Sequence, residues 1–252
     1  MKIGMCSELM NAPLVAGAGF DYIESATTAL ASASEEDYRR MAEAVFQSGI
    51  AAEAFNVMLP GNFCITGPAA DLDPVKEYLE RGFRRMAELG AVIQVFGSGG
   101  ARNVPEGWPM ERALEQLVDF LNMAAPLAAR QSIFIAIEPL NPGECNIINT
   151  VEDARALAVR AGLANVGVLA DWYHMSKQHE KPDGMLAAGK ALLHCHVANP
   201  EGRRFPLPGD GADYTAFFGA MRQVGYTGRV SVEAKGTQEE YSACLRRMRE
   251  CV

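Results

Sequence analysis

The chain has 252 residues, of which 49% are hydrophobic, and its formal net charge is −8. This length suits one large core, and about 200–250 residues is usual for a single α/β barrel. The acidic total argues against a nucleic-acid partner, which would need a basic face to neutralise phosphates. No apolar run approaches the roughly 18 residues of a membrane span, so we expect no membrane partner.

The cysteines and the N-terminal residues give an expectation for the cellular compartment of the protein. The six cysteines form no C-x-x-C pair and are expected to be reduced thiols. Residues 1–20 lack the long apolar core of a signal peptide. We therefore expect a cytoplasmic protein. No sequence feature points to an interface, so association into a homo-oligomer stays open.

Short apolar segments alternate with helical patterns along the whole chain. The continuous apolar character of the segments is typical of parallel strands covered on both faces by helices. The expected strands are 2–6, 20–24, 51–57, 92–96, 132–138, 166–171, 192–197 and 229–233. The expected helices are 34–49, 73–90, 109–130, 150–162, 213–225 and 237–251, and Pro126 should kink or shorten the third of them.

Eight strands in 252 residues leave about 31 residues for each unit, the usual length of a βα repeat. This rhythm predicts a closed (β/α)8 TIM barrel in a single domain, residues 1–252. A doubly wound open sheet is the alternative. It is disfavoured because no G-x-G-x-x-G motif follows the first strand, where a dinucleotide site would need it.

Four successive predicted strands each end on a residue that can bind a divalent metal. A single Glu in this position is more commonly a helix cap or half of an ion pair. Four such residues in register favour one shared site, because the carboxyl ends of barrel strands converge on one face. Three carboxylates and one imidazole suit Mn²⁺, Mg²⁺ or Co²⁺ better than a structural zinc, and we favour Mn²⁺ while keeping Zn²⁺ as an alternative. The residues are Glu138, Asp171, His196 and Glu233.

Neighbouring residues add to this site. His174 lies three residues after Asp171 and can reach over the same mouth. His194 precedes His196 by two, so both should face the same side of the strand, with His194 deeper and structural. His179 lies in a polar loop and should be solvated.

Two loops are expected to cover the mouth. Glu144 lies six residues beyond Glu138, and Arg203 and Arg204 follow the seventh strand in a Gly/Pro-rich segment. We expect Arg204 to be a surface residue. The glycines of 95–108 predict a turn rather than a phosphate nest, which favours an unphosphorylated substrate.

These motifs resemble those of the xylose-isomerase-like TIM barrels, a sugar isomerase and epimerase family that includes ketose 3-epimerases and hydroxypyruvate isomerases. The matching pieces are IEPLN with Glu138, the following Glu144-Cys145, D-x-x-H-M at Asp171–Met175, H-x-H at His194–His196, and V-x-V-E ending at Glu233. Members of the family often carry Arg-Phe after EPLN, where this chain has Pro142-Gly143.

The resemblance implies a role for each residue. Glu138, Asp171, His196 and Glu233 would hold one metal ion, and Glu138 and Glu233 would also act as acid and base. Glu144, His174 and Arg203 would bind the oxygens of a sugar. Together they would move a proton beside a carbonyl through a cis-enediolate, and the implied reaction is 3-epimerisation of an unphosphorylated ketose.

Four other functions share part of this residue pattern. An aldose–ketose isomerase of the hydroxypyruvate type, an inosose-type dehydratase and a non-catalytic sugar- or metal-binding subunit would keep the same ligands, and they stay open. The abasic-site DNA endonuclease of the same barrel family needs three zinc ions and many more histidines on early strands. It is disfavoured because all four histidines lie between positions 174 and 196 and the chain is acidic.

Overall fold

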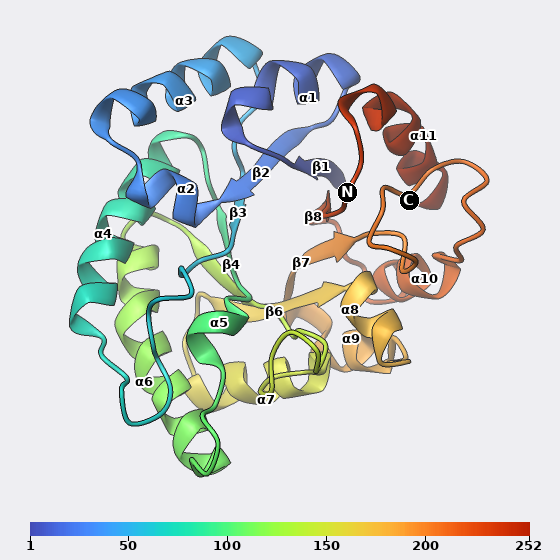
Figure 1. Ribbon diagram of the computed structural model, residues 1–252. Helices are drawn as coiled ribbons and strands as arrows, with labels where there is room; N and C mark the ends of the chain where they lie inside the picture. The colour runs from blue at the N-terminus through green and yellow to red at the C-terminus, as the bar shows by residue number, and fades with distance from the viewer.

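Eight parallel strands form a closed barrel in the computed structural model, which describes residues 1–252, and this confirms the predicted (β/α)8 architecture. In Figure 1 the strands form a ring and the helices lie outside it. The strands are β1 Lys2–Cys6, β2 Tyr22–Ala26, β3 Ala54–Asn56, β4 Ile93–Phe96, β5 Phe134–Ile137, β6 Val166–Asp171, β7 Leu192–Val197 and β8 Arg229–Val232. The ring closes where β1 pairs with β8, with Lys2 opposite Arg229.

Five strands differ from the predicted ranges, and three of them differ by two residues or more at one end. The segments predicted at 20–24, 51–57 and 132–138 are paired only over parts of those ranges or slightly beyond them. Phe20, Ala52 and Ile133 precede their strands yet are buried. Apolar residues in the turns below the barrel therefore look like strand residues in the sequence, although no ladder hydrogen bonds place them in the sheet.

The six predicted helices are all present, and five short helices are additional. The helices are α1 Ala12–Ala18, α2 Thr27–Ser32, α3 Glu35–Ser48, α4 Asp73–Glu88, α5 Gly99–Arg102, α6 Met110–Ala129, α7 Val151–Ala161, α8 Trp172–Lys177, α9 Asp183–Ala188, α10 Thr215–Gln223 and α11 Tyr241–Cys251, with 3-10 turns at Leu9–Asn11, Gly189–Ala191 and Gln238–Glu240. The unpredicted helices α1, α2, α5, α8 and α9 are too short to produce a clear 3.6-residue period.

Pro126 was expected to kink or shorten its helix, and the shortening is wrong. α6 continues through Pro126 to Ala129. The carbonyl of Pro126 still accepts a hydrogen bond from the Arg130 amide at 3.3 Å. Leu127 and Ala128 are buried, so packing against the barrel keeps the last turn helical despite the lost donor.

Local capping agrees with the sequence at several helix ends. The Ser34 hydroxyl accepts a hydrogen bond from the Asp37 amide at 3.1 Å at the start of α3, and Gly49 ends that helix with a φ of 77°. Thr150 and Asp153 form a capping box at the start of α7. None of the helices combines the length and apolar composition needed to cross a bilayer.

The interior of the barrel is built in layers, because residues two apart on a strand face the same side. One layer consists of Tyr22, Ala54, Ile93, Val95, Ala136 and Leu169, which form an apolar cluster. Two positions further along β5 and β6 come Glu138 and Asp171. The pattern that fills the barrel with apolar side chains therefore also places these acids at its mouth.

Gly4 packs so closely against the Tyr22 ring that a larger residue would not fit, and a substitution can test this requirement for glycine. A Cβ at position 4 would overlap the ring of Tyr22, whose hydroxyl lies 2.6 Å from the hydroxyl of Ser231. We expect Gly4→Ala to lower the free energy of unfolding by about 1–3 kcal/mol through overpacking. Denaturant titration measures this change.

Gly17→Ala is the matched control. Gly17 is an exposed residue of α1, and a Cβ there would meet nothing within 4 Å. This substitution should raise stability by up to about 1 kcal/mol because alanine favours the helix. Equal stability of Gly4→Ala and the wild type would show that the Tyr22 ring is free to move.

Candidate active site

The four predicted metal ligands meet at the carboxyl ends of β5 to β8. Single ligand atoms of Glu138, Asp171, His196 and Glu233 all lie within 4.8 Å of one another. The His196 Nδ1 atom is 3.1 Å from Glu138 Oε1 and 3.3 Å from Glu233 Oε2. Glu138, Asp171 and His196 are buried, whereas Glu233 is partly exposed. The barrel thus brings together residues separated by up to 95 positions in the sequence, from 138 to 233.

Glu24, in the middle of β2, orients the histidines of this cluster. Its two carboxylate oxygens lie 2.9 Å from His196 Nε2 and 2.8 Å from His194 Nε2. The hydroxyl of Ser231 adds a hydrogen bond to Glu24 at 2.5 Å. Because Nε2 of His196 faces this carboxylate, it carries the proton in the neutral ring, and the lone pair of Nδ1 points to the cluster. The expected structural role of His194 is confirmed.

Glu24 was not identified from the sequence. Burial alone would raise the pKa of its carboxyl group, but the imidazoles of His196 and His194 hold that pKa well below its usual range. The only sequence signal was an acid at the end of the predicted strand 20–24, the position that Glu138, Asp171 and Glu233 occupy on their predicted strands.

Asp171 has one oxygen engaged and one free. Its Oδ1 atom accepts a hydrogen bond from the Tyr173 amide at 2.7 Å and so caps α8. Its Oδ2 atom is buried without a hydrogen-bond partner. A buried carboxylate oxygen without a partner is costly, and a cation beside it would remove that cost. The residues present therefore fit a divalent metal bound by Asp171, Glu138, Glu233 and His196.

The two glutamates of the cluster differ in their acidity. Burial raises the pKa of Glu138, and the nearby carboxylate of Glu233 adds to the rise. Burial also opposes ionisation of Glu233, but the charge and hydrogen bond of His196, together with Arg203, lower its pKa to about 2. Arg203 Nη2 lies 2.5 Å from Glu233 Oε2. Two similar carboxyl groups thus have different proton affinities in one site.

His174 has an unpaired ring nitrogen beside Asp171. Its Nδ1 atom accepts a hydrogen bond from the Asn141 amide at 3.1 Å, so in the neutral ring the proton resides on Nε2. The Nε2 atom is buried without a hydrogen-bond partner and lies 3.6 Å from Asp171 Oδ2. It is therefore a donor available to an oxygen of a bound molecule.

Glu144 and Arg203 lie together at the rim. Glu144 Oε1 accepts a hydrogen bond from Asn141 Nδ2 at 2.9 Å, and its Oε2 is 3.6 Å from Arg203 Nη1. The guanidinium of Arg203 lies 4.7 Å from the centre of the Tyr173 ring, and its backbone has a φ of 52°. All three predicted substrate-binding residues are thus adjacent to the cluster. Arg204 and His179 are exposed, as expected.

A family model confirms the resemblance found in the sequence. The model of the xylose isomerase-like TIM barrel matches residues 13–251. The chain belongs to this family.

Relatives in this xylose isomerase-like family include sugar epimerases. The chain is 28% identical to the 3-dehydro-D-guloside 4-epimerase of Escherichia coli over 185 residues, 66% of this chain and 70% of that one. It is 27% identical to the D-psicose 3-epimerase of Agrobacterium fabrum over 227 residues, 87% of this chain and 76% of that one. By these similarities the chain is an enzyme of the isomerase class.

A solved structure shows the same barrel. The D-allulose 3-epimerase from Methylomonas sp. in complex with D-allulose superimposes with a TM-score of 0.85 at 21% identity, covering 100% of this chain and 97% of that one. At this identity the likeness supports the fold alone.

Three further residues hold the side chains and strand ends of this site in place, and none of the three was identified from the sequence. Asn56 Nδ2 donates a hydrogen bond to Glu233 Oε1 at 2.9 Å. A Cβ at Gly97 would overlap the carboxylate of Glu138, so glycine leaves room for that side chain. The buried guanidinium of Arg102 donates to the carbonyls of Phe96 and Glu138 at 2.8 and 2.7 Å, which fixes the ends of β4 and β5.

Glu24→Gln tests the orientation of the histidines. The amide can accept from only one of the two imidazoles, so a buried donor loses its partner. We expect the free energy of unfolding to fall by about 1–3 kcal/mol. We also expect the ring-nitrogen NMR signals of His194 and His196 to shift, while those of exposed His179 stay in place.

Glu53→Gln is the matched control, because Glu53 is also a buried glutamate but pairs with Lys2 and Arg229 near the opposite ends of the strands. It should leave the histidine signals unchanged. Identical histidine spectra for the two variants would contradict the orienting role of Glu24.

Proposed function

We propose that this protein is a divalent-metal-dependent sugar epimerase that moves a proton beside a carbonyl through a cis-enediolate, most simply at C3 of an unphosphorylated ketose. The observation that carries the proposal is the convergence of two glutamates, from β5 and β8, on one imidazole within 3.3 Å. Epimerisation needs one group to remove a proton and another to return one, and the cluster supplies two carboxyl groups.

Glu138, Asp171, His196 and Glu233 are the proposed ligands of one ion, with Mn²⁺ favoured because three carboxylates and an imidazole form a mostly hard ligand set. The bound ion would supply positive charge to the carbonyl and neighbouring hydroxyl oxygens of the sugar. His196 offers Nδ1 for this purpose because Glu24 occupies its other nitrogen.

Glu233 and Glu138 are the proposed proton carriers. Glu233 is held by Asn56 at one oxygen and by Arg203 at the other, which fixes its carboxylate where it could accept a proton. Glu138 approaches the same imidazole from the end of β5 and would return a proton with its own carboxyl group. Each positioned acid or base contributes about 10²–10⁴ in rate.

His174, Glu144 and Arg203 are the proposed substrate-binding residues. His174 would donate its Nε2 proton to a sugar oxygen, and Glu144 would accept from a hydroxyl. Arg203 is engaged by Glu233 and Glu144, so it is not free to neutralise a phosphate. This pairing supports an unphosphorylated sugar. The six free cysteines are compatible with the proposed cytoplasmic location, and homo-oligomer formation is retained as a hypothesis.

Deuterium exchange tests the reaction directly. The metal-stripped and the Mn²⁺-loaded protein are incubated in D₂O with D-fructose, D-tagatose and D-allulose, and proton NMR follows the label. We expect deuterium only with metal and at C3. Glu233→Gln and Glu138→Gln should each lower the exchange rate by about 10²–10⁴ because one proton carrier is lost.

The position of the label separates the alternatives. Deuterium at the C1/C2 pair instead of C3 would identify an aldose–ketose isomerase, and loss of water would identify a dehydratase. Tight Mn²⁺ binding without exchange of any ketose would favour a binding subunit. Exchange that is equally fast without metal would contradict the proposed mechanism.

Asp171→Asn tests the metal site without any substrate. The amide oxygen is a weaker ligand than the free Oδ2 of Asp171, so Mn²⁺ affinity measured by titration calorimetry should fall by more than about tenfold. Asp119→Asn changes an exposed aspartate on α6 and serves as the control. Equal Mn²⁺ affinity in the two variants would exclude Asp171 as a ligand.

A further inference from the structure

The glycine-rich segment Gly97–Gly100 follows β4 directly and leads into α5. The sequence predicted a turn here, and the proposed chemistry gives none of the four residues a part in proton transfer. The backbone of the segment nevertheless contacts two residues of the site. A Cβ at Gly97 would overlap the carboxylate of Glu138, and a Cβ at Gly99 would lie 2.7 Å from the backbone carbonyl oxygen of Glu144. Side chains at these two positions would therefore displace a proposed metal ligand and a proposed substrate-binding loop.

Ser98, between these glycines, connects the loops that follow β3 and β4. Its backbone has a φ of 39°, which is uncommon for a residue other than glycine. In this conformation its hydroxyl accepts a hydrogen bond from the amide of buried Leu59 at 2.9 Å. Its carbonyl accepts from the amides of Ala101 and Arg102 at 3.0 and 3.3 Å, and so starts the helix whose Arg102 side chain holds the carbonyl of Glu138. Ser98 therefore ties the support of Glu138 to the loop after β3.

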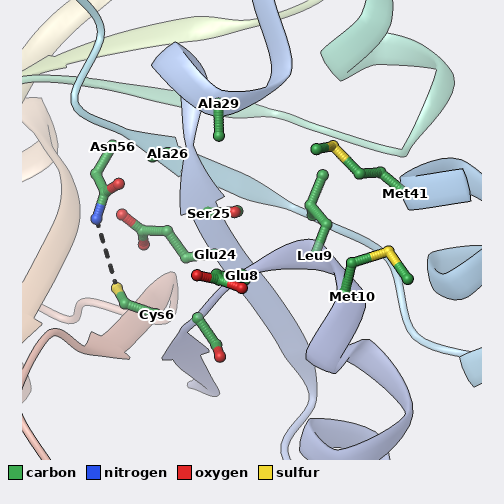
Figure 2. A pocket seen from close by; sticks show the side chains of 11 residues that line it. Cys6, Glu8, Leu9, Met10, Glu24, Ser25, Ala26, Ala29, Met41 and Asn56 are labelled. Atoms are coloured by element: carbon green, nitrogen blue, oxygen red, sulfur yellow. Dashed lines mark hydrogen bonds between the residues drawn. The ribbon is translucent and has the colours of Figure 1, made fainter. Parts of the chain in front are cut away.

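The loop after β3 supports the other proposed proton carrier. The side-chain amide of Asn56 donates one hydrogen bond to Glu233 Oε1 at 2.9 Å and a second to Cys6 Sγ at 3.8 Å. Figure 2 shows the bond between Asn56 and Cys6, next to Glu24, in a cavity that residues of β1 to β3 line. Two hydrogen bonds thus fix the amide of Asn56, and this amide holds one oxygen of Glu233.

Val57 shows that this loop is held against a conformational preference. It has a φ of 44°, and this region of backbone conformation is strained for a β-branched side chain. Such strain persists only where the surrounding structure fixes the backbone, and it concentrates at functional sites. The side-chain bonds of Asn56 fix the chain directly before Val57, and the bond from Leu59 to Ser98 fixes it two residues further on. Ser98 and Glu233 are therefore linked through one strained loop.

We propose, on the basis of the proposed function, that Gly97 and Ser98 are positioning residues that set the separation of the Glu138 and Glu233 carboxylates. Gly97 fixes the place of the first carboxylate by leaving room for it. Ser98 fixes the second through the loop that carries Asn56. Removal and return of a proton need both carboxyl groups within reach of the same carbon, and a misplacement of about 1 Å costs about 10² in rate.

Ser98→Ala tests the link between the loops. The variant keeps a Cβ in the left-handed conformation and removes only the hydroxyl that accepts from Leu59. In the Mn²⁺-loaded protein, kcat for deuterium exchange at C3 should fall about tenfold, with KM changed less than about twofold, for whichever of D-fructose, D-tagatose and D-allulose exchanges fastest. Ser132→Ala is the matched control, because Ser132 is also a left-handed serine, with a φ of 58°, but precedes β5 at the opposite end of the barrel. It should retain the wild-type kcat.

A double variant separates positioning from a general loss of structure. If Ser98 acts on Glu233 through Asn56, its hydroxyl has no effect once that amide is gone. Ser98→Ala should therefore lower kcat less than about twofold in an Asn56→Ala background. A merely structural role predicts that the two losses multiply, and multiplied losses would overturn the proposal.

Gly97→Ala tests the other half of the proposal. The atom that the new Cβ meets is the end of a flexible side chain, so the fold persists while the Glu138 carboxylate moves. Mn²⁺ affinity measured by titration calorimetry should fall by more than about tenfold. Gly219→Ala on α10, where a Cβ meets nothing within 4 Å, should leave this affinity unchanged. Wild-type Mn²⁺ affinity in Gly97→Ala would show that Gly97 does not set the place of Glu138.

An NMR measurement without metal or substrate keeps this proposal separate from the proposed function. The side-chain amide signals of Asn56 should move in Ser98→Ala and stay in place in Ser132→Ala. If they do so although no ketose exchanges deuterium, the epimerase function is wrong and the link between the loops stands. If the wild type exchanges at C3 while Ser98→Ala keeps its kcat and its Asn56 signals, the function stands and the positioning role of Ser98 is wrong.

Discussion

The hydrogen bonds of Glu24 tie β2 to β7 and β8 across the mouth of the barrel. A fully buried carboxylate is tolerated only when its oxygens are paired, and here two imidazoles and a hydroxyl provide the partners. The same contacts decide which nitrogen of His196 faces the cluster. Glu24 holds the His196 ring so that its Nδ1 atom faces Glu138 and Glu233. The proposed chemistry of the site therefore depends on this one buried carboxylate.

The carboxylates around His196 lie close enough to repel one another, and this repulsion is unfavourable for folding. Three carboxylates lie near one imidazole, and Asp171 retains an oxygen without a partner. Arg203 balances part of this charge from the rim, held over the Tyr173 ring. Such an arrangement lowers stability and is retained where a ligand or a reaction needs it. A bound cation and a sugar would satisfy the groups that the protein leaves open.

The two halves of the barrel mouth differ in the side chains that line them. Strands β5 to β8 contribute the acidic and imidazole groups, whereas β1 to β3 and the helices that follow them line a mostly apolar cavity. Asn56 belongs to both, because it lines the cavity and holds Glu233.

Local pattern in the sequence determined the barrel, the helices that carry caps and the four residues at the ends of β5 to β8. These features are visible because strand periodicity and helix capping act within a few residues. Glu24 and Arg102 look like ordinary charged residues in the sequence, and the apolar turns around Phe20 and Ile133 look like strand. Only the tertiary structure decided their roles, because barrel closure places Glu24 beside His194, 170 residues away, and no local pattern encodes such a contact.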